Sequence, residues 1–484
     1  MSGSPLYFLT ITELAGSIRE KQVSPVAVTE AMLSRIEALD GRYNSYATVM
    51  ADHAMESAQR AENEIAAGRY LGPLHGVPVA VKDLCFTRGV PTMGGTPVLS
   101  GHIPDFDATV ISKLASAGAV LLGKLNLTEG AMAGYHPDFP IPVNPWGPDL
   151  WTGVSSSGSG VATAAGLCFG SLGSDTGGSI RFPAASCGIV GIKPTWGLVS
   201  RYGVLALAES MDHVGPMTRS AADAGIMLQA IAGHDANDPT SLTGTAPDML
   251  SGLEESVRGV RIGLDRRYVE ENVDGELSAA VLAGIGVMEG LGSEIVQVNL
   301  PETREYTKAW NLLCSAEAPD AHRATYPSRR EEYGPWFRGW LDKGSEVTGA
   351  DYARANNVRA ECNGSLRRVF ENIDVLACPS MTTPPGRVNS EELYGPMGDR
   401  DSLVWGRFTV PFDFNGAPTL SLPCGLNSDG LPLSLQFVGK HLGEALLCRL
   451  GHAYEQATDW HRRRPAVGTH EGDRRGQDNG AGGG

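Results

Sequence analysis

The sequence predicts an α/β protein built on a mostly parallel or mixed sheet. Short apolar runs alternate with longer stretches of helical periodicity from residue 72 onward, which is typical of α/β folds. The chain has 484 residues, and 42% of them are hydrophobic, which is enough apolar mass for a large buried core. The 61 glycines lie between apolar runs and indicate many tight turns rather than a low-complexity chain.

The N-terminal part is predicted to be helical. Thr10 and Glu13 fit a capping box, in which each end of the first turn satisfies the other. Ser24 followed by Pro25 is typical of an N-cap and a first helical position. A third helix is predicted over 51–68, with Gly68 at its end.

Strands and helices then alternate without a clear linker or an internal repeat. We expect strands at 77–81, 119–122, 189–192, 260–264, 294–300, 375–378, 419–423 and 433–438. We expect helices at 108–117, 161–169, 220–232, 277–291 and 444–456, with several more between 302 and 371. Residues 465–484 are polar and rich in glycine, so we expect them to be disordered.

Charge and cysteine usage narrow the class of partner and the compartment. The formal net charge is −16, and nonspecific binding to nucleic acid or to anionic lipid needs a basic surface instead. Eight cysteines are scattered with no C-x-x-C pair and are expected to be reduced core residues. We find neither a signal peptide nor an apolar run of about 18 residues, so a cytoplasmic protein is expected.

Several common catalytic motifs are missing from the sequence. There is no H-E-x-x-H for zinc, no G-x-S-x-G elbow and no P-loop, so neither a metal nor an organic cofactor is expected. Two segments rich in Gly and Ser remain, at 152–160 and 173–181. They are either flexible loops or tight turns whose backbone N–H groups stabilise an oxyanion. A serine nucleophile needs a base, and no histidine accompanies these segments. Lys82, at the end of a predicted strand, is either a solvated lysine or that base.

These segments resemble the amidase signature family. The residues that carry the resemblance are Gly76–Asp83, the Ser/Gly segment at 152–160, and the run from Gly173 to Thr195. Further matching stretches lie at 123–129, 199–203, 211–219 and 421–425. The resemblance covers about residues 8–464 and its motifs are long and in order, so chance is a poor explanation.

The resemblance implies a single large domain, with helices on both faces of a mixed central sheet. This domain would span residues 1–464 and have its catalytic core at about 72–220. A Ser–cis-Ser–Lys triad is implied as well, with Lys82 as base, Ser155 as bridging serine and Ser179 as nucleophile. Since 155–157 are all serines, a register shift by one would make Ser156 the bridge. The implied oxyanion hole consists of the backbone N–H groups of Thr176, Gly177, Gly178 and Ser179.

Neighbouring residues have structural roles in this interpretation. A lysine can act as a base only when neutral, and burial without a carboxylate partner lowers its pKa. Asp83 is expected to point to the opposite face of its strand from Lys82. We expect Asp175 to organise its loop through backbone N–H groups, Arg181 to hold that loop in place, and Asp212 to act as a turn residue.

The predicted activity is hydrolysis of amide bonds through an acyl-enzyme on Ser179. Esters and carbamates present a similar planar carbonyl, and aryl amides and carbamates are the substrates we expect to fit. Met132, Ala133 and Gly134 are predicted to bind substrate, together with the loop up to residue 144 and the helices after 303. Trp310, Trp336, Trp340 and Trp405 are further candidates for the pocket.

An alternative is the glutaminase subunit of a tRNA-dependent amidotransferase, because Ser200–Gly203 resembles that subunit. The stretches 315–322 and 329–335 look more like free-standing amidases. The expected partner is therefore a small-molecule substrate, with no nucleic acid and no membrane. We expect a monomer or a homodimer.

Overall fold

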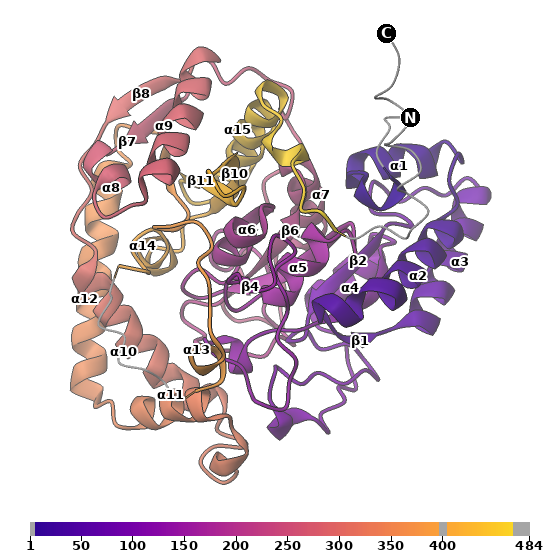
Figure 1. Ribbon diagram of the computed structural model, residues 1–484, viewed down its shortest axis with the longest axis horizontal. Helices are drawn as coiled ribbons and strands as arrows, with labels where there is room; N and C mark the ends of the chain where they lie inside the picture. Colours follow the sequence, from indigo (N-terminus) through magenta and orange to yellow (C-terminus); the bar gives the residue numbers. More distant parts are fainter. Residues whose placement is uncertain (1–4, 396–403, 468–484) are drawn as a thin grey trace.

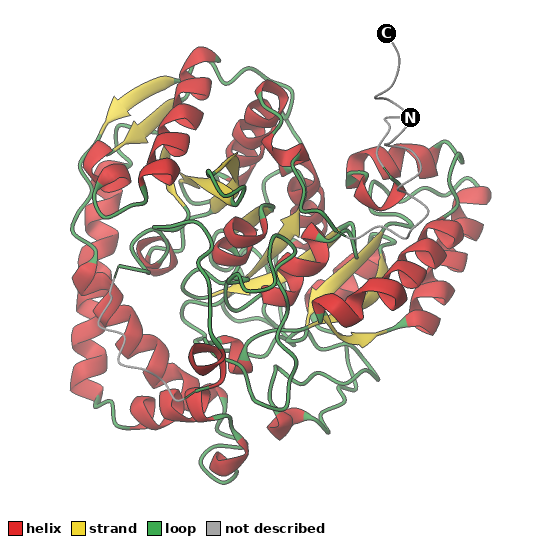
Figure 2. Ribbon diagram, viewed as in Figure 1, coloured by secondary structure: helices red, strands yellow, loops and turns green. Residues whose placement is uncertain are grey.

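Eleven strands form one mixed sheet in the computed structural model, which describes residues 5–395 and 404–467 (Figures 1 and 2). The strands are β1 (Tyr46–Val49), β2 (Pro78–Lys82), β3 (Val120–Leu125), β4 (Gly170–Asp175), β5 (Val190–Lys193), β6 (His213–Thr218), β7 (Arg261–Leu264), β8 (Glu294–Gln297), β9 (Val375–Pro379), β10 (Thr419–Leu426) and β11 (Pro432–Gly439). Their order across the sheet is β1-β3-β2-β4-β6-β5-β10-β11-β9-β7-β8. The β2 strand is parallel to β3 and β4, and β7 is parallel to β8 and β9, whereas the other pairs are antiparallel. The predicted single α/β domain with a mixed sheet is confirmed.

Fifteen α-helices accompany the sheet within the described residues. They are α1 (Ile11–Arg19), α2 (Pro25–Tyr43), α3 (Ala51–Ala66), α4 (Thr109–Ser116), α5 (Ser157–Ala164), α6 (Arg181–Cys187), α7 (Ala221–Ile231), α8 (Arg266–Glu270), α9 (Gly275–Gly290), α10 (Arg304–Ala321), α11 (Pro335–Ser345), α12 (Gly349–Val369), α13 (Ser390–Tyr394), α14 (Val410–Phe414) and α15 (Glu444–Ala457). Figure 1 shows α10, α11 and α12 gathered on one side of the molecule, away from α1, α2 and α3. The long helical segment after residue 303 therefore forms a separate wall beside the sheet.

Helices cover both faces of the sheet, as the β4 strand shows. The hydroxyl of Ser171 lies 2.9 Å from Thr163 Oγ1 and donates to the Ser159 carbonyl at 3.1 Å, both in α5. On the opposite face, a Cβ on Gly170 would lie 2.5 Å from the sulfur of Met227 in α7. Both helices approach this strand so closely that only small residues fit between them.

The predicted N-terminal helices and their caps are present. The Thr10 hydroxyl and the Glu13 carboxylate form the reciprocal capping box at the start of α1. The side chain of Ser24 accepts a hydrogen bond from Ala27 N, and Pro25 occupies the first position of α2. Gly68 follows α3 with φ +87°, a left-handed conformation that glycine adopts at little cost.

The prediction of a helix over 161–169 is wrong at both ends. The helix α5 begins at Ser157 and ends at Ala164, and the chain then enters β4, a strand that the sequence did not predict. The Gly/Ser segment after residue 170 is therefore partly a strand and not a loop. Its small residues have low strand propensity, but burial between α5 and α7 overrides that preference. The strand β6 was missed for a related reason, because Pro216 inside it argues against a central strand.

The remaining boundary predictions are settled only in part. Within the described residues, all eight cysteines are buried and unpaired, as expected for reduced core residues. The domain limits 1–464 and the core limits 72–220 stay predictions. Residues 468–484, most of the tail predicted to be disordered, lie outside the described residues.

Candidate active site

Lys82, the last residue of β2, lies at the centre of a buried group of hydroxyls. Its side chain is 1% exposed. The Nζ atom lies 2.6 Å from Ser155 Oγ, 3.0 Å from Ser156 Oγ and 2.8 Å from Ser174 Oγ. Burial lowers the pKa of Lys82 to about 7, although the negative charge of Asp175 acts in the opposite direction. A substantial fraction of this amine is therefore neutral near neutral pH.

Asp83 points away from this group, as predicted from the alternation of side chains along a strand. Its carboxylate pairs with Lys124 Nζ at 3.0 Å and accepts the backbone N–H of Met93 at 3.0 Å. Lys82 pairs with no carboxylate among the described residues. The neighbouring acid thus does not stabilise the charged form of Lys82.

Ser155 and Ser156 differ in how their hydroxyls are used. The Ser156 hydroxyl donates to the carbonyl of Ser174 and accepts the backbone N–H of the same residue, both at 3.1 Å. Ser155 Oγ contacts Lys82, and no other hydrogen-bond partner of it occurs among the described residues. The Val154–Ser155 peptide bond is cis. Ser156 therefore ties its turn to β4, whereas the Ser155 hydroxyl stays free to exchange partners.

The loop between β4 and α6 is organised by one buried carboxylate. Asp175 accepts the backbone N–H of Gly178 at 2.7 Å and that of Ile180 at 2.9 Å. Arg181 forms two side-chain hydrogen bonds to Asp175, at 2.8 and 3.0 Å, and a third to Asp413 at 2.7 Å. Burial would raise the pKa of Asp175, but the Arg181 guanidinium keeps it well below its usual range. The contacts agree with the predicted structural roles of Asp175 and Arg181.

The backbone of this loop presents N–H groups beside Ser179. Those of Thr176, Gly177 and Ser179 have no acceptor among the described residues, whereas that of Gly178 donates to Asp175. The prediction that all four N–H groups form the oxyanion hole therefore needs correction at Gly178. Gly178 has φ +132°, and a Cβ there would lie 2.3 Å from the ring of Phe182, so its role is conformational.

Trp310 of α10 packs directly onto the same loop. Its indole N–H donates to the carbonyl of Thr176 at 2.7 Å, and a Cβ on Gly177 would lie 2.4 Å from its ring. The hydroxyl of Thr176 donates to Asp212 at 2.6 Å, and Asp212 also accepts the backbone N–H groups of Leu207 and Ala208. The predicted turn residue Asp212 thus also supports the loop that carries Ser179.

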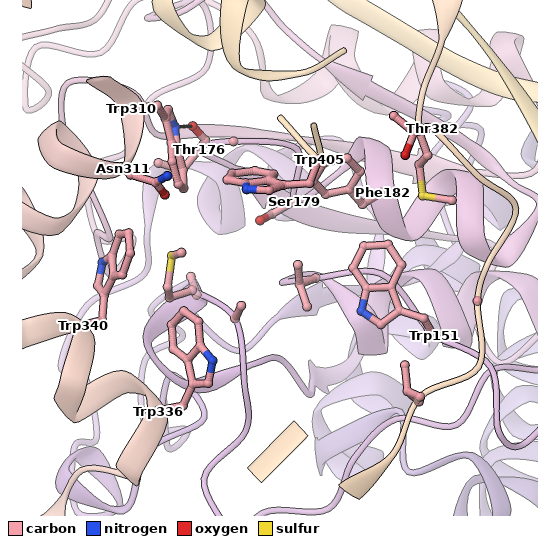
Figure 3. Close-up of a pocket in the computed structure, with 18 of the residues that line it drawn as sticks. Trp151, Thr176, Ser179, Phe182, Trp310, Asn311, Trp336, Trp340, Thr382 and Trp405 are labelled. Carbon is pink, nitrogen blue, oxygen red and sulfur yellow. Dashed lines mark hydrogen bonds between the residues drawn. The ribbon is translucent and has the colours of Figure 1, made fainter. Parts of the chain in front are cut away.

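Ser179 lies at a cavity of about 580 Å³ with largely aromatic walls. Figure 3 shows Trp310, Trp336 and Trp340 on one side of Ser179 and Trp151 on the other. The aromatic lining residues are Trp151, Phe182, Trp310, Trp336, Trp340 and Trp405. Lys343 and Arg387 are the charged residues among the described lining residues, and both are cationic.

The predicted substrate-binding residues reach this cavity only in part. Met132 and Ala133 line it, as do the four tryptophans that were candidates from the sequence. Gly134 is not among the lining residues, because it lies beneath Trp336, whose Cγ would be 2.7 Å from a Cβ at this position. The prediction for Gly134 is therefore wrong in its detail. Sequence reasoning also missed Trp151, Phe182 and Met381, which carry no motif of their own.

The described residues contain no group of three or more His, Cys, Asp or Glu side chains that could hold a metal ion. No helix among the described residues is both long and apolar enough to span a membrane.

A hydroxyl-rich site beside a buried lysine and an enclosed cavity is characteristic of a hydrolase that uses a serine nucleophile. The Amidase family matches residues 27–448 of this chain. A Mycobacterium tuberculosis protein named as an amidase, AmiD, is 46% identical over 462 residues, which cover 95% of this chain and 96% of that protein. The glutamyl-tRNA(Gln) amidotransferase of Geobacter metallireducens has one polypeptide that is 38% identical over 488 residues, covering 96% of this chain and all of that polypeptide.

Among solved structures, the native peptide amidase of Stenotrophomonas maltophilia is similar with a TM-score of 0.83 and 30% identity. That match covers 96% of this chain and 100% of the peptide amidase. The chain belongs to the Amidase family, which confirms the resemblance stated from its motifs, and it is an amide-hydrolysing enzyme.

Proposed function

We propose that Ser179 is the nucleophile of this amidase and that Lys82 is its base, acting through Ser155. The observation that carries the proposal is the 2.6 Å contact between Ser155 Oγ and the buried Nζ of Lys82, beside the cavity that Ser179 lines. A serine hydroxyl needs a base to become nucleophilic, and a lysine can serve only when it is neutral. Burial supplies that condition here by lowering the pKa of Lys82 to about 7.

Counting protons at Lys82 favours Ser155 over Ser156 as the bridge. A neutral amine has two N–H donors and one lone pair, and three hydroxyls surround Nζ. The hydrogen of the Ser156 hydroxyl is engaged by the Ser174 carbonyl, so Ser156 can only accept from Lys82. If Lys82 donates to Ser156 and Ser174, its lone pair is left to accept the Ser155 hydroxyl. Ser155 can then pass a proton from Ser179 to Lys82.

The oxyanion hole of this proposal consists of the backbone N–H groups of Thr176, Gly177 and Ser179. They are the N–H groups of the loop without an acceptor among the described residues. Gly178 contributes by a different route, since its N–H binds Asp175 and holds the loop in shape. In other hydrolases, each such donor is worth about 2.7–4 kcal/mol in the transition state.

The reaction then proceeds by acyl transfer. Ser179 Oγ attacks the amide carbonyl while its proton moves through Ser155 to Lys82. The C–N bond breaks as Lys82 returns that proton to the leaving nitrogen, and the amine or ammonia departs. Water attacks the acyl-enzyme with the same proton route and releases the carboxylic acid.

The cavity favours aryl or other large apolar substrates over free glutamine. Its walls offer six aromatic rings, which bury large planar groups well. Free glutamine carries an ammonium group, and no carboxylate occurs among the described lining residues to pair with it. We therefore favour a free-standing amidase for aryl amides and carbamates over the glutaminase subunit of an amidotransferase.

The test is a matched panel of anilides, aryl carbamates, nitrophenyl esters and primary amides, including glutamine, assayed with the purified protein. The proposal expects kcat/KM for the anilides to exceed that for glutamine by about 100-fold or more. Turnover of glutamine alone, with release of ammonia, would overturn it in favour of the glutaminase subunit.

A further inference from the structure

Glu129 is a buried carboxyl group that the proposed mechanism does not use. It follows β3 and is 1% exposed. Its two oxygens lie 3.0 and 3.1 Å from the backbone N of Gly334, which stands 205 residues later in the chain. Gly334 is the N-cap residue of α11 and has no side chain with which to cap the helix itself.

The two segments joined by this contact form adjacent walls of the cavity. Ala131, Met132 and Ala133 follow Glu129 directly and line the cavity from one side. Trp336, Trp340 and Lys343 belong to α11 and line it from the other. Glu129 itself is not among the lining residues, so it does not contact substrate.

The two walls also fit each other closely. A Cβ on Gly130 would lie 2.2 Å from the ring of Phe337, and one on Gly134 would lie 2.7 Å from Trp336. Both glycines have positive φ, at +58° and +81°. The 129–134 turn is thus shaped to receive the first turn of α11, and Glu129 supplies a polar contact at this junction.

The charges around Glu129 suit this role. A carboxylate near a helix N-terminus is favoured by the helix dipole, and Arg338 of α11 adds a positive charge nearby. Tyr333 and His136 are the other titratable groups close to this junction. Burial raises the pKa of Glu129 to about 7, so the site accepts the neutral carboxyl group as well.

We propose that Glu129 is a positioning residue that holds the 129–134 turn against the N-terminus of α11 and thereby fixes the width of the substrate cavity. The proposal rests on the proposed function only in taking this cavity as the substrate site. It predicts that loss of Glu129 weakens binding of large acyl groups while the chemistry at Ser179 continues.

The experiment compares Glu129→Ala, Glu129→Gln and the control Glu332→Gln in the full chain. Glu332 lies two residues before Gly334, is exposed, and pairs with Arg329 at the surface. For Glu129→Ala we expect KM for an anilide with an aryl acyl group to rise by about 10-fold or more. We expect kcat for a small acetyl ester, and the rate at which a small phosphonate labels Ser179, to change by no more than about twofold.

Glutamine keeps the shape and one acceptor oxygen, so Glu129→Gln is expected to stay within about threefold of the wild-type KM. Gly334→Ala tests the same contact from the other side, because its Cβ would lie 2.5 Å from Glu129 Oε2, and the same rise in KM is expected. This variant decides the question if Glu129→Ala does not fold.

Equal KM changes for large and small acyl groups would overturn the proposal, as would a Glu129→Gln variant as impaired as Glu129→Ala. A similar shift in Glu332→Gln would do the same. Loss of phosphonate labelling in the wild-type protein would instead contradict the assignment of Ser179, so the two failures are distinguishable.

Discussion

The two sides of the cavity are built in different ways. Around Lys82 and Ser179, the side chains are polar, buried and hydrogen-bonded, and they come from three neighbouring segments of β2, α5 and β4. The opposite wall consists mainly of tryptophans from α10, α11 and the segment around Trp405. Chemistry requires particular groups at hydrogen-bond distances, whereas a binding wall requires apolar area of a suitable shape. The first region therefore carries motifs in the sequence and the second does not.

The two regions meet at one place, where Trp310 packs on the loop of Ser179. The indole N–H holds the Thr176 carbonyl, and Gly177 leaves room for the ring. If the two regions act independently, variants in the polar region should abolish turnover and variants in the wall should alter substrate preference. Variants at the junction should do both.

The largest effect is expected from Ser179→Ala, which removes the proposed nucleophile. Turnover should fall by about a million-fold, as it does on loss of the nucleophile in another serine hydrolase, and phosphonate labelling should disappear. Circular dichroism should show an unchanged fold, and Ser100→Ala at an exposed turn is the control. Labelling of the Ser179→Ala protein at the wild-type rate would place the nucleophile elsewhere.

Arg181→Met should cost stability because it leaves Asp175 and Asp413 buried without their cation. Removing one partner of such a group costs about 3–5 kcal/mol, which urea unfolding would measure. The matched control is Arg387→Gln, since Arg387 is exposed and pairs with Asp149 at the surface. Exposed pairs contribute about 0–1 kcal/mol. A loss for Arg181→Met no larger than that of the control would contradict the account of this loop.

Gly177→Ala tests the junction of the two regions. Its Cβ would lie 2.4 Å from the Trp310 ring, so either the ring or the loop must move. We expect kcat/KM to fall by about 100-fold, roughly the cost of losing one oxyanion donor. Gly286→Ala in α9 is the control, because nothing lies within 4 Å of a Cβ at that position. Wild-type activity in Gly177→Ala would show that the contact between Trp310 and the loop does not matter.

Trp340→Leu should have the smallest effect and should act on selectivity alone. The ring is 3% exposed and lies on the cavity wall away from the hydroxyl group of Ser179. We expect kcat/KM for an aryl-acyl anilide to fall by about 10-fold relative to an acetyl anilide. The phosphonate labelling rate should stay the same. Equal losses for both anilides would mean that the wall also shapes the chemistry.

The polar region was largely predictable because its residues lie in contiguous motifs. The sequence placed Lys82 at a strand end and identified Asp175 and Arg181 as loop residues, and the contacts agree. It could not show that the Gly178 N–H is engaged by Asp175, since that depends on a turn geometry. It also missed β4, whose small residues become a strand only through packing on both faces.

The wall was much less predictable. Four of its tryptophans were candidates, but nothing in the sequence indicated which faced the cavity or that Trp151 and Phe182 would join them. These residues are separated by long stretches of chain and are brought together only by the arrangement of α10, α11 and the 381–405 segment. Apolar rings satisfy any buried position of the right size, so their place follows from tertiary packing alone.

The role of Lys82 is the central claim, and the choice of leaving group tests it. An amide nitrogen must gain a proton to leave, whereas a nitrophenolate leaves without one. If Lys82 both accepts and returns the proton, wild-type kcat/KM for an anilide should rise with pH through about 7, as the lysine becomes neutral.

The decisive measurement is kcat/KM of wild type and Lys82→Ala for an anilide and a nitrophenyl ester that share one acyl group. General acid–base catalysis is worth about 10²–10⁴-fold, so we expect Lys82→Ala to lose far more anilide than ester hydrolysis. Equal proportional losses on the two substrates would show that Lys82 only orders the site, and the proton relay through Ser155 would be contradicted.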